Sequence, residues 1–209
     1  NKNVGTGKTV TLTETNAGDD VNNYSITAQG TTTANVTAKA LTVNAELTSA
    51  TKEYDGTTTA AVTSSGLVGL VGDEDVTATG GGNYDNANVG TGKAITISYT
   101  LQDGETSGLA SNYTIAEQTT NTGVITAKAL TYTVSASNKT YDGGTDATVT
   151  LTLSGMIDDE TLTETNSSTF SDKNVGTDKT VTVDSITLGN GDNGGLATNY
   201  SIATGNTTT

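Results

Sequence analysis

The chain has 209 residues and a net charge of −14, with 32% hydrophobic and 4% aromatic residues. An acidic surface repels nucleic acid and anionic lipid, and no apolar run approaches the roughly 20 residues of a membrane-spanning helix, so we expect neither nucleic-acid binding nor membrane insertion. His, Cys and Arg are absent from the sequence. Without the usual general base and the thiol nucleophile, we predict that the chain is not an enzyme.

Apolar residues and Thr alternate in many segments with the period of a β-strand. The first such segment is 8–13, in which Val10 and Leu12 share one face. One apolar face and one face of Thr is typical of a half-exposed antiparallel sheet. Further strands are predicted at 40–49, 58–65, 75–79, 94–101, 112–118, 122–127, 147–153 and 180–183.

These strands predict an all-β fold. Because so little bulky apolar material is present, several small cores are easier to build than one large core. We predict tandem small antiparallel β-sandwich-like modules arranged end to end. The alternative is a set of β-grasp-like modules, each with one short helix.

Short motifs recur in a fixed order with a period of about 87 residues, which is the size of a small domain rather than of a solenoid coil. The sequence Asn-Val-Gly-Thr-Gly-Lys, for example, begins at Asn3 and Asn88 and returns with one change at Asn174. We interpret the chain as an internal piece of a longer protein. The predicted modules are the C-terminal part of a first (1–38, repeat 1), a complete second (39–125, repeat 2) and a nearly complete third (126–209, repeat 3).

The predicted junction between repeats 2 and 3 lies within residues 123–134, which contain no Pro and no block of charge. A flexible linker would have a different composition. We therefore expect the last strand of one module to run directly into the first strand of the next, with little hinge freedom. Several modules joined in this way would form a rod.

The Tyr-Asp-Gly motif occurs once in repeat 2 and once in repeat 3. A ligand-binding role would use the Asp, whereas a structural role has Gly in a turn conformation, Asp bonded to nearby backbone and Tyr packed with its hydroxyl satisfied. Recurrence in each module favours the structural role. The residues assigned to structural motifs are Tyr54, Asp55, Gly56, Tyr141, Asp142, Gly143, Asn88, Gly90, Asn174, Gly176, Asn112, Tyr113, Asn199 and Tyr200.

The segment that begins at Asn88 superficially resembles a phosphate-binding loop, but one residue rather than four separates its glycines and a strand follows it. We predict a tight hairpin or bulge there.

Acidic residues recur at the 86-residue offset and offer oxygens that Ca²⁺ prefers, although the Asp-x-Asp-x-Asp-Gly pattern typical of calcium-binding loops is missing. We interpret these residues as solvated turn acids, and the alternative is a structural calcium site with candidate ligands Asp73, Glu74, Asp75, Asp158, Asp159 and Glu160.

Taken together, these motifs resemble the YDG and MBG repeat modules of large bacterial surface proteins, including filamentous-haemagglutinin-like adhesins. The resemblance extends over essentially the whole chain and rests on several short motifs in order. It implies an exported, extracellular stalk or adhesin repeat at the bacterial cell surface. It supplies neither a ligand nor a catalytic residue.

The leading hypothesis is a structural repeat of an adhesin stalk or surface fibre. One alternative is a module that binds a host or abiotic surface or another ligand directly. Another is a self-assembling fibre subunit, in which residues 1–38 pair with an identical chain by strand addition. The partners expected under the leading hypothesis are neighbouring modules of the same chain, and no cofactor beyond the calcium candidates is expected.

Overall fold

The computed structural model describes residues 1–27, 29–47 and 50–209. In this part of the chain the regular structure is β-strand, apart from three 3-10 helices of three residues each. The all-β prediction is confirmed, and strands occur near every predicted segment. The last two residues of the strand predicted at 40–49 lie outside the described part. Within the described residues, no helix has the length and apolarity needed to cross a bilayer.

Contacts divide the chain into two compact units. The division runs through repeat 2, so each unit contains the contacts between two successive repeats. Unit 1 consists of Asn1–Thr48, Val62–Gly81 and Ile97–Gln118, and unit 2 consists of Ser49–Ala61, Gly82–Thr96 and Thr119–Thr209.

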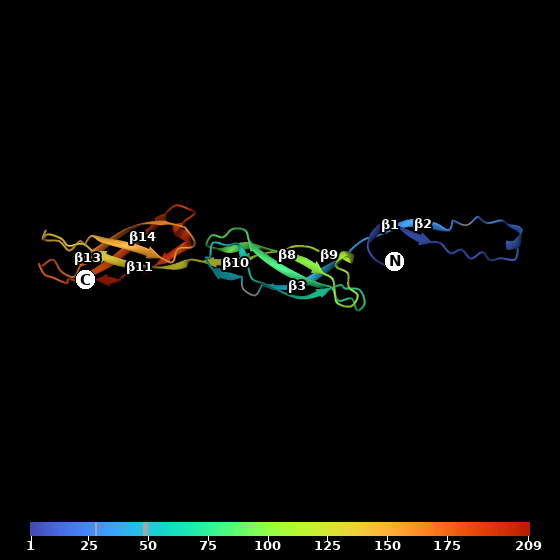
Figure 1. Cartoon of the computed structure of the whole chain (residues 1–209), viewed down its shortest axis with the longest axis horizontal. Coiled ribbons are helices and arrows are strands. Elements are labelled where there is room, and N and C mark those ends of the chain that lie inside the picture. Colours follow the sequence, from blue (N-terminus) through green and yellow to red (C-terminus); the bar gives the residue numbers. More distant parts are fainter. Residues whose placement is uncertain (28, 48–49) are drawn as a thin grey trace. The chain divides into compact units, whose positions relative to one another are not determined.

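Unit 1 contains two small sheets (Figure 1). One is the antiparallel pair β1–β2, and the other has the order β6-β3-β9. Strand β3 pairs antiparallel with β6 but parallel with β9, a mixed arrangement that the alternation of residues did not predict. The elements are β1 (Gly5–Thr11), η1 (Val21–Asn23), β2 (Thr31–Val36), β3 (Lys39–Leu47), β6 (Val62–Val68), η2 (Ala110–Asn112) and β9 (Tyr113–Ile115).

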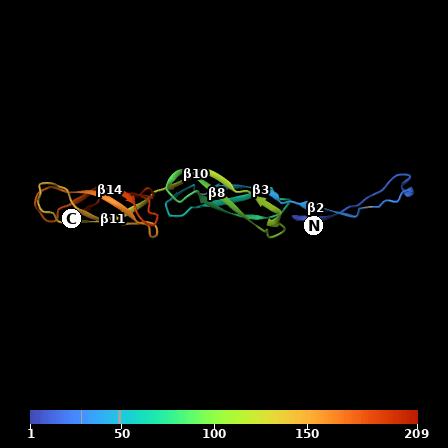
Figure 2. The same cartoon turned by 90° about the horizontal axis from the view of Figure 1, so that it is seen from above.

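Repeat 3 lies wholly in unit 2 and forms a sandwich-like pair of three-stranded sheets, with the orders β12-β11-β15 and β13-β14-β16. Strands β11 and β14, one from each sheet, lie close together in both Figure 1 and Figure 2. The elements are β11 (Lys128–Ala136), β12 (Val149–Ser154), β13 (Leu162–Phe170), β14 (Val181–Asn190), η3 (Ala197–Asn199), β15 (Tyr200–Ile202) and β16 (Thr207–Thr208).

The remaining strands belong to repeat 2 and form a five-stranded sheet with the order β4-β10-β8-β7-β5. Strands β7 and β8 continue from one unit into the other along the chain. The bounds are β4 (Thr51–Glu53), β5 (Thr59–Ala60), β7 (Thr77–Tyr84), β8 (Gly90–Gln102) and β10 (Gln118–Thr126).

A parallel pair brings two of the sequence motifs together in both repeats 2 and 3. In repeat 2 Lys39 of the Ala-Lys-Ala-Leu segment is level with Tyr113, and in repeat 3 Lys128 is level with Tyr200. The first strand of a repeat therefore lies beside the Asn-Tyr motif, more than 70 residues later in the sequence. Only one residue, Ala127, separates β10 from β11, so the junction between these repeats is short.

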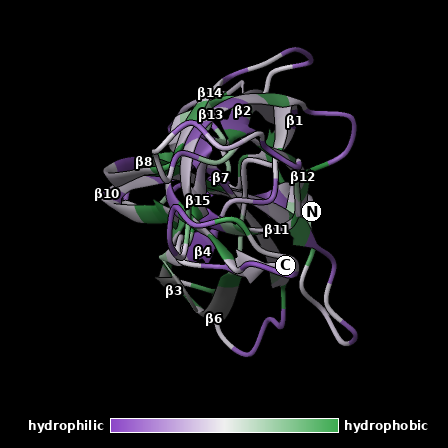
Figure 3. Ribbon diagram, turned by 90° about the vertical axis from the view of Figure 1, so that its left-hand side faces the viewer, coloured by the Kyte–Doolittle hydropathy of each residue, from purple (hydrophilic) through white to green (hydrophobic). Residues whose placement is uncertain are grey.

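The cores are small, as the composition predicts. In unit 1 Leu41, Val76 and Tyr113 form a buried cluster. In unit 2 the alternating residues Val181 and Val183 of β14 are almost completely buried, which is the pattern of a strand with one face against a core. Figure 3 colours the strands by hydropathy, with hydrophobic stretches in green and hydrophilic stretches in purple.

Gly123 occupies a place in unit 2 that leaves no room for a side chain. A Cβ there would lie 2.8 Å from the carbonyl oxygen of Lys93, 2.8 Å from Cε1 of Tyr84 and 3.0 Å from Cδ1 of Ile95. We expect Gly123→Ala to destabilise this region by about 1–3 kcal/mol, because the backbone oxygen cannot move without shifting a strand. Urea unfolding followed by circular dichroism measures the loss.

Gly81→Ala is the matched control, since a Cβ at Gly81 meets nothing within 4 Å and the residue also lies in a strand. The control is expected to unfold at or above the urea midpoint of the original chain. Equal midpoints for the two variants would show that Gly123 is not tightly packed.

Candidate functional site

The Tyr-Asp-Gly segment of repeat 2 forms a turn closed by its own side chains. The carboxylate of Asp55 accepts the backbone N–H of Thr57 at 2.9 Å and pairs with Lys52 Nζ at 2.6 Å. Gly56 has a φ of +75°, a left-handed conformation that disfavours a Cβ. Burial raises the pKa of Asp55, but the hydrogen bonds from Lys52 and Thr57 outweigh it and the pKa lies below its ordinary value.

The turn of repeat 3 has the same internal contacts. Asp142 accepts the backbone N–H of Gly144 at 2.9 Å and pairs with Lys139 at 2.9 Å, and Gly143 has a φ of +81°. The Lys139 ammonium and the Gly144 N–H hold the pKa of Asp142 below its usual range. In both copies the Asp is engaged in building the turn.

The Asn-Val-Gly-Thr-Gly-Lys loop is closed by its terminal Lys. Lys93 is buried, and its Nζ lies 2.8 Å from Oδ1 of Asn86 and 3.0 Å from Oδ1 of Asp85. Strand β8 begins at Gly90 within this loop. In repeat 1 the register of β1 shifts between Gly5 and Lys8, which is the irregularity expected of a bulge.

In repeat 3 the corresponding loop is also closed on itself. Lys179 bonds to Asp172 and donates to the carbonyl oxygen of Asn174 at 2.9 Å. Gly176 is exposed in the loop that precedes β14. Lys179 therefore supports the loop in the way that Lys93 does in repeat 2.

In repeats 2 and 3 the Asn of the Asn-Tyr motif contacts the preceding repeat. Asn199 of repeat 3 accepts the backbone N–H of Val89 at 3.0 Å and donates its amide to Oδ1 of Asn88 at 3.1 Å. Asn199 is completely buried. We call this pair of hydrogen bonds the Asn clasp.

The same clasp occurs between repeats 1 and 2. Asn112 accepts the backbone N–H of Val4 at 2.9 Å and donates to Oδ1 of Asn3 at 3.2 Å. Two motifs that recur in the sequence thus recognise each other across successive repeats.

The Tyr of the Asn-Tyr motif anchors an acidic loop of its own repeat. Tyr113 donates its hydroxyl to Glu74 at 2.6 Å and accepts the backbone N–H of Val71 at 3.0 Å. In repeat 3 Tyr200 does the same with Glu160 at 2.6 Å and Ile157 at 3.0 Å. Each Glu is therefore held in place with one carboxylate oxygen still available.

The second oxygen of each Glu reaches the preceding repeat. Glu160 accepts the hydroxyl of Tyr54, from the Tyr-Asp-Gly motif of repeat 2, at 2.6 Å. The Tyr54 ring also meets the Tyr200 ring edge to face, with centroids 5.4 Å apart. At the other junction the second oxygen of Glu74 accepts from Lys2 of repeat 1 at 2.7 Å. We call these contacts the Glu clasp.

The Glu clasp makes the junction between repeats 2 and 3 sensitive to alkali. Burial, followed by the adjacent carboxylate of Glu160, raises the pKa of Tyr54 from 10.0 to about 12. The neutral Tyr54 hydroxyl stabilises the folded chain fully below pH 10, where it is neutral in both folded and unfolded chains. This contribution to the free energy of unfolding is lost as the pH rises through about 12. We expect the thermal midpoint, measured by circular dichroism, to fall steeply between these pH values.

Tyr54→Phe is the control for this titration. Its thermal midpoint should be lower near neutral pH and should fall less between pH 10 and 12 than that of the original chain. Absorbance of tyrosinate should show one late-ionising group fewer in the variant. A Tyr54 that ionises near pH 10 in the folded chain would contradict the assigned contact.

The calcium candidates are distributed over separate structural roles. Asp75 accepts the backbone N–H groups of Thr106, Ser107 and Gly108, which hold its pKa far below the ordinary value. Within the described residues, no three acidic side chains gather as a metal-binding group. The acids near the two Glu residues are Asp73, Asp158 and Asp159, and Asp158 is in a left-handed conformation with a φ of +47°.

Sequence reasoning did not find the acceptor role of the two Glu residues, which it weighed only as calcium ligands. The signal was present, because Glu74 and Glu160 keep the same spacing from the Asn-Tyr motif of their repeats to within one residue. Lys2 was not singled out at all. The two motif tyrosines also differ, since Tyr54 is 4% exposed and Tyr141 is 61% exposed.

The fold and the two clasps define a class of protein: tandem all-β repeats that recognise one another through side chains held by recurring motifs. The profile of the YDG domain matches residues 37–121 and again residues 126–209, so the chain belongs to the YDG domain family. Comparisons with curated proteins and with solved structures gave no significant match.

Proposed function

We propose that the chain is a structural segment of an extracellular adhesin stalk or surface fibre of a bacterium. The observation that carries this proposal is that both junctions are built from the same clasps. Recurring contacts at junctions suit an array in which each repeat is bound to the next in the same way, through the motif residues.

The clasps also suit a segment that bears load. At the junction of repeats 2 and 3 the completely buried Asn199 accepts the backbone N–H of Val89. The Glu160 carboxylate accepts the hydroxyl groups of both Tyr54 and Tyr200. Separating the repeats would leave the backbone N–H of Val89 without its acceptor and would expose Tyr54. Each of these hydrogen bonds contributes about 0.5–1.5 kcal/mol, and somewhat more where the acceptor is a carboxylate, so several bonds must break together before the repeats separate under bending or pulling.

Small-angle X-ray scattering of the chain tests the mechanical part of the proposal. We expect an elongated particle with the cross-section of one repeat, and a shorter maximum dimension for the double variant Glu160→Ala/Asn199→Ala. An original chain that scatters like a flexible string of beads would contradict it.

Antibodies against residues 39–209 should label intact cells that produce the protein, and labelling only after lysis would contradict the extracellular location.

A further inference from the structure

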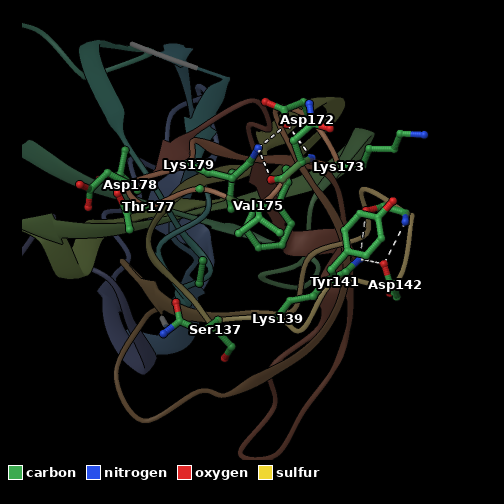
Figure 4. A pocket seen from close by; sticks show the side chains of 18 residues that line it. Ser137, Lys139, Tyr141, Asp142, Asp172, Lys173, Val175, Thr177, Asp178 and Lys179 are labelled. Carbon is green, nitrogen blue, oxygen red and sulfur yellow. Dashed lines mark hydrogen bonds and ion pairs between the residues drawn. The ribbon is translucent and has the colours of Figure 1, made fainter.

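The end of repeat 3 that carries the Tyr-Asp-Gly turn and the Asn174 loop lies around an open hollow of about 600 Å³ (Figure 4). We call this surface the end face. It contains Tyr141 and Val175, and Lys173 lies at its edge. Val175 is 89% exposed, although its counterpart Val4 in repeat 1 is only 37% exposed.

The end face is the counterpart of a surface that is covered in repeat 2. Tyr141 corresponds to Tyr54, whose hydroxyl is bonded by Glu160 of the following repeat. Val175 corresponds to Val89, whose backbone N–H is bonded by Asn199 of the following repeat. The exposed groups are thus the ones that the Glu and Asn clasps use elsewhere in this chain.

The end face already has the conformation that a clasp requires. The N–H of Asn174 is bonded to Asp172 at 2.7 Å, as the N–H of Asn88 is bonded to Asn86 at 3.0 Å in the occupied junction. The two Tyr-Asp-Gly turns likewise share their ion pair and their left-handed Gly. Binding at this face therefore has little conformational entropy to lose.

The charges on the end face indicate a carboxylate as the central group of its partner. Lys173 corresponds in sequence to Lys2, which pairs with Glu74 at the first junction. Repeat 2 has Ala87 at this position and relies on Tyr54 alone. Repeat 3 has both the Lys and the Tyr, so its end face offers an ammonium and a hydroxyl to one carboxylate.

We propose that the end face of repeat 3 is a docking site for a further YDG-type module joined in register after repeat 3, whose loop Glu and Asn-Tyr pair are free. This inference rests on the proposed function in taking the junction as the element that repeats. The Glu of the partner binds Tyr141 and Lys173, and its Asn binds Val175 N–H and Asn174. In this chain Glu74 with Asn112, and Glu160 with Asn199, are already bound at internal junctions. A second copy would therefore have to break one of its own junctions to dock.

The test extends the chain in register. Residues 123–209 are added after Thr209, so that Thr209 takes the place of Thr122 and repeat 3 is followed by another copy of itself. Nitration of tyrosines, read by peptide mass spectrometry, reports their exposure. We expect nitration of Tyr141 to fall at least about fivefold in the extended chain, while Tyr54 stays protected in both.

A matched variant of the extended chain carries Glu160→Gln and Asn199→Ala in the added copy only. It should restore the reactivity of Tyr141, while the Tyr200 counterpart in the added copy stays protected and reports that this copy is folded. A Tyr141 that reacts equally in the original and extended chains, with Tyr54 still protected, would overturn the proposal. So would a dimer of the original chain that is abolished by Tyr141→Ala, because the occupant would then be a second copy.

These outcomes are independent of the test of the proposed function. Protection of Tyr141 reports docking at the end face, whatever the scattering shows of the length of the particle. An elongated particle with an unprotected Tyr141 would retain the stalk function and reject the docking site.

Discussion

Among single substitutions in the clasps, Glu160→Ala is expected to loosen the junction between repeats 2 and 3 the most. The carboxylate accepts hydroxyl groups from both Tyr54 and Tyr200 at 2.6 Å. Both tyrosines are buried, so removing the shared acceptor costs about 1–3 kcal/mol for each hydroxyl proton left without an acceptor, while Tyr200 still accepts the N–H of Ile157. Urea unfolding measures the loss, and nitration of Tyr54 should increase.

Two further variants separate the hydrogen bonds from the charge. Glu160→Gln keeps one acceptor oxygen, so its loss of stability should be smaller than that of Glu160→Ala. Some loss remains, because the amide nitrogen cannot accept the second hydroxyl. Asp159→Ala removes a carboxylate from the same loop and should leave the junction close to the original. If Asp159→Ala were as harmful as Glu160→Ala, the effect would come from the loop charge and the shared-acceptor explanation would fail.

Asn199→Ala is expected to open the Asn clasp of the same junction. The substitution leaves the backbone N–H of Val89 without its acceptor and removes the donor to Asn88, at a cost of about 1–3 kcal/mol for the unpaired group. The most direct readout is hydrogen exchange at the Val89 amide. We expect this amide to exchange at least about fivefold faster.

Asn112→Ala makes the equivalent change at the junction between repeats 1 and 2 and provides the matched comparison. It should accelerate exchange at Val4 while leaving Val89 unchanged, because the two clasps share no residue. The losses of the two variants should add in the double variant. Unchanged exchange at Val89 in Asn199→Ala would show that the clasp does not protect this amide.

The fold class could be predicted because alternation of Thr with Val, Ile or Leu is a local property of the chain. Residues 94–101, for example, form part of β8, in which Ile95 and Ile97 are buried. The parallel pairing of β3 with β9 could not be predicted, since nothing local distinguishes a strand that pairs in parallel from one that pairs antiparallel. The mixed sheets depend on contacts between distant segments.

The candidate site was predicted in part. The Asp of the Tyr-Asp-Gly motif, the Tyr of the Asn-Tyr motif and the first Asn of the Asn-Val loop were singled out as structural, but as separate turns within one repeat. Their partners lie as far as 111 residues away, as for Asn199 and Asn88. Such pairing is invisible in the sequence because recurrence at one period shows only that motifs are reused.

By itself the sequence determined that this is an acidic all-β protein built from copies of one unit, because strand alternation, turn residues and repetition are all carried by neighbouring residues. Only the tertiary structure decided that the copies are joined through the motifs themselves. A hydrogen bond between Tyr54 and Glu160 requires two loops of different repeats to meet at 2.6 Å, and that meeting depends on how whole repeats pack.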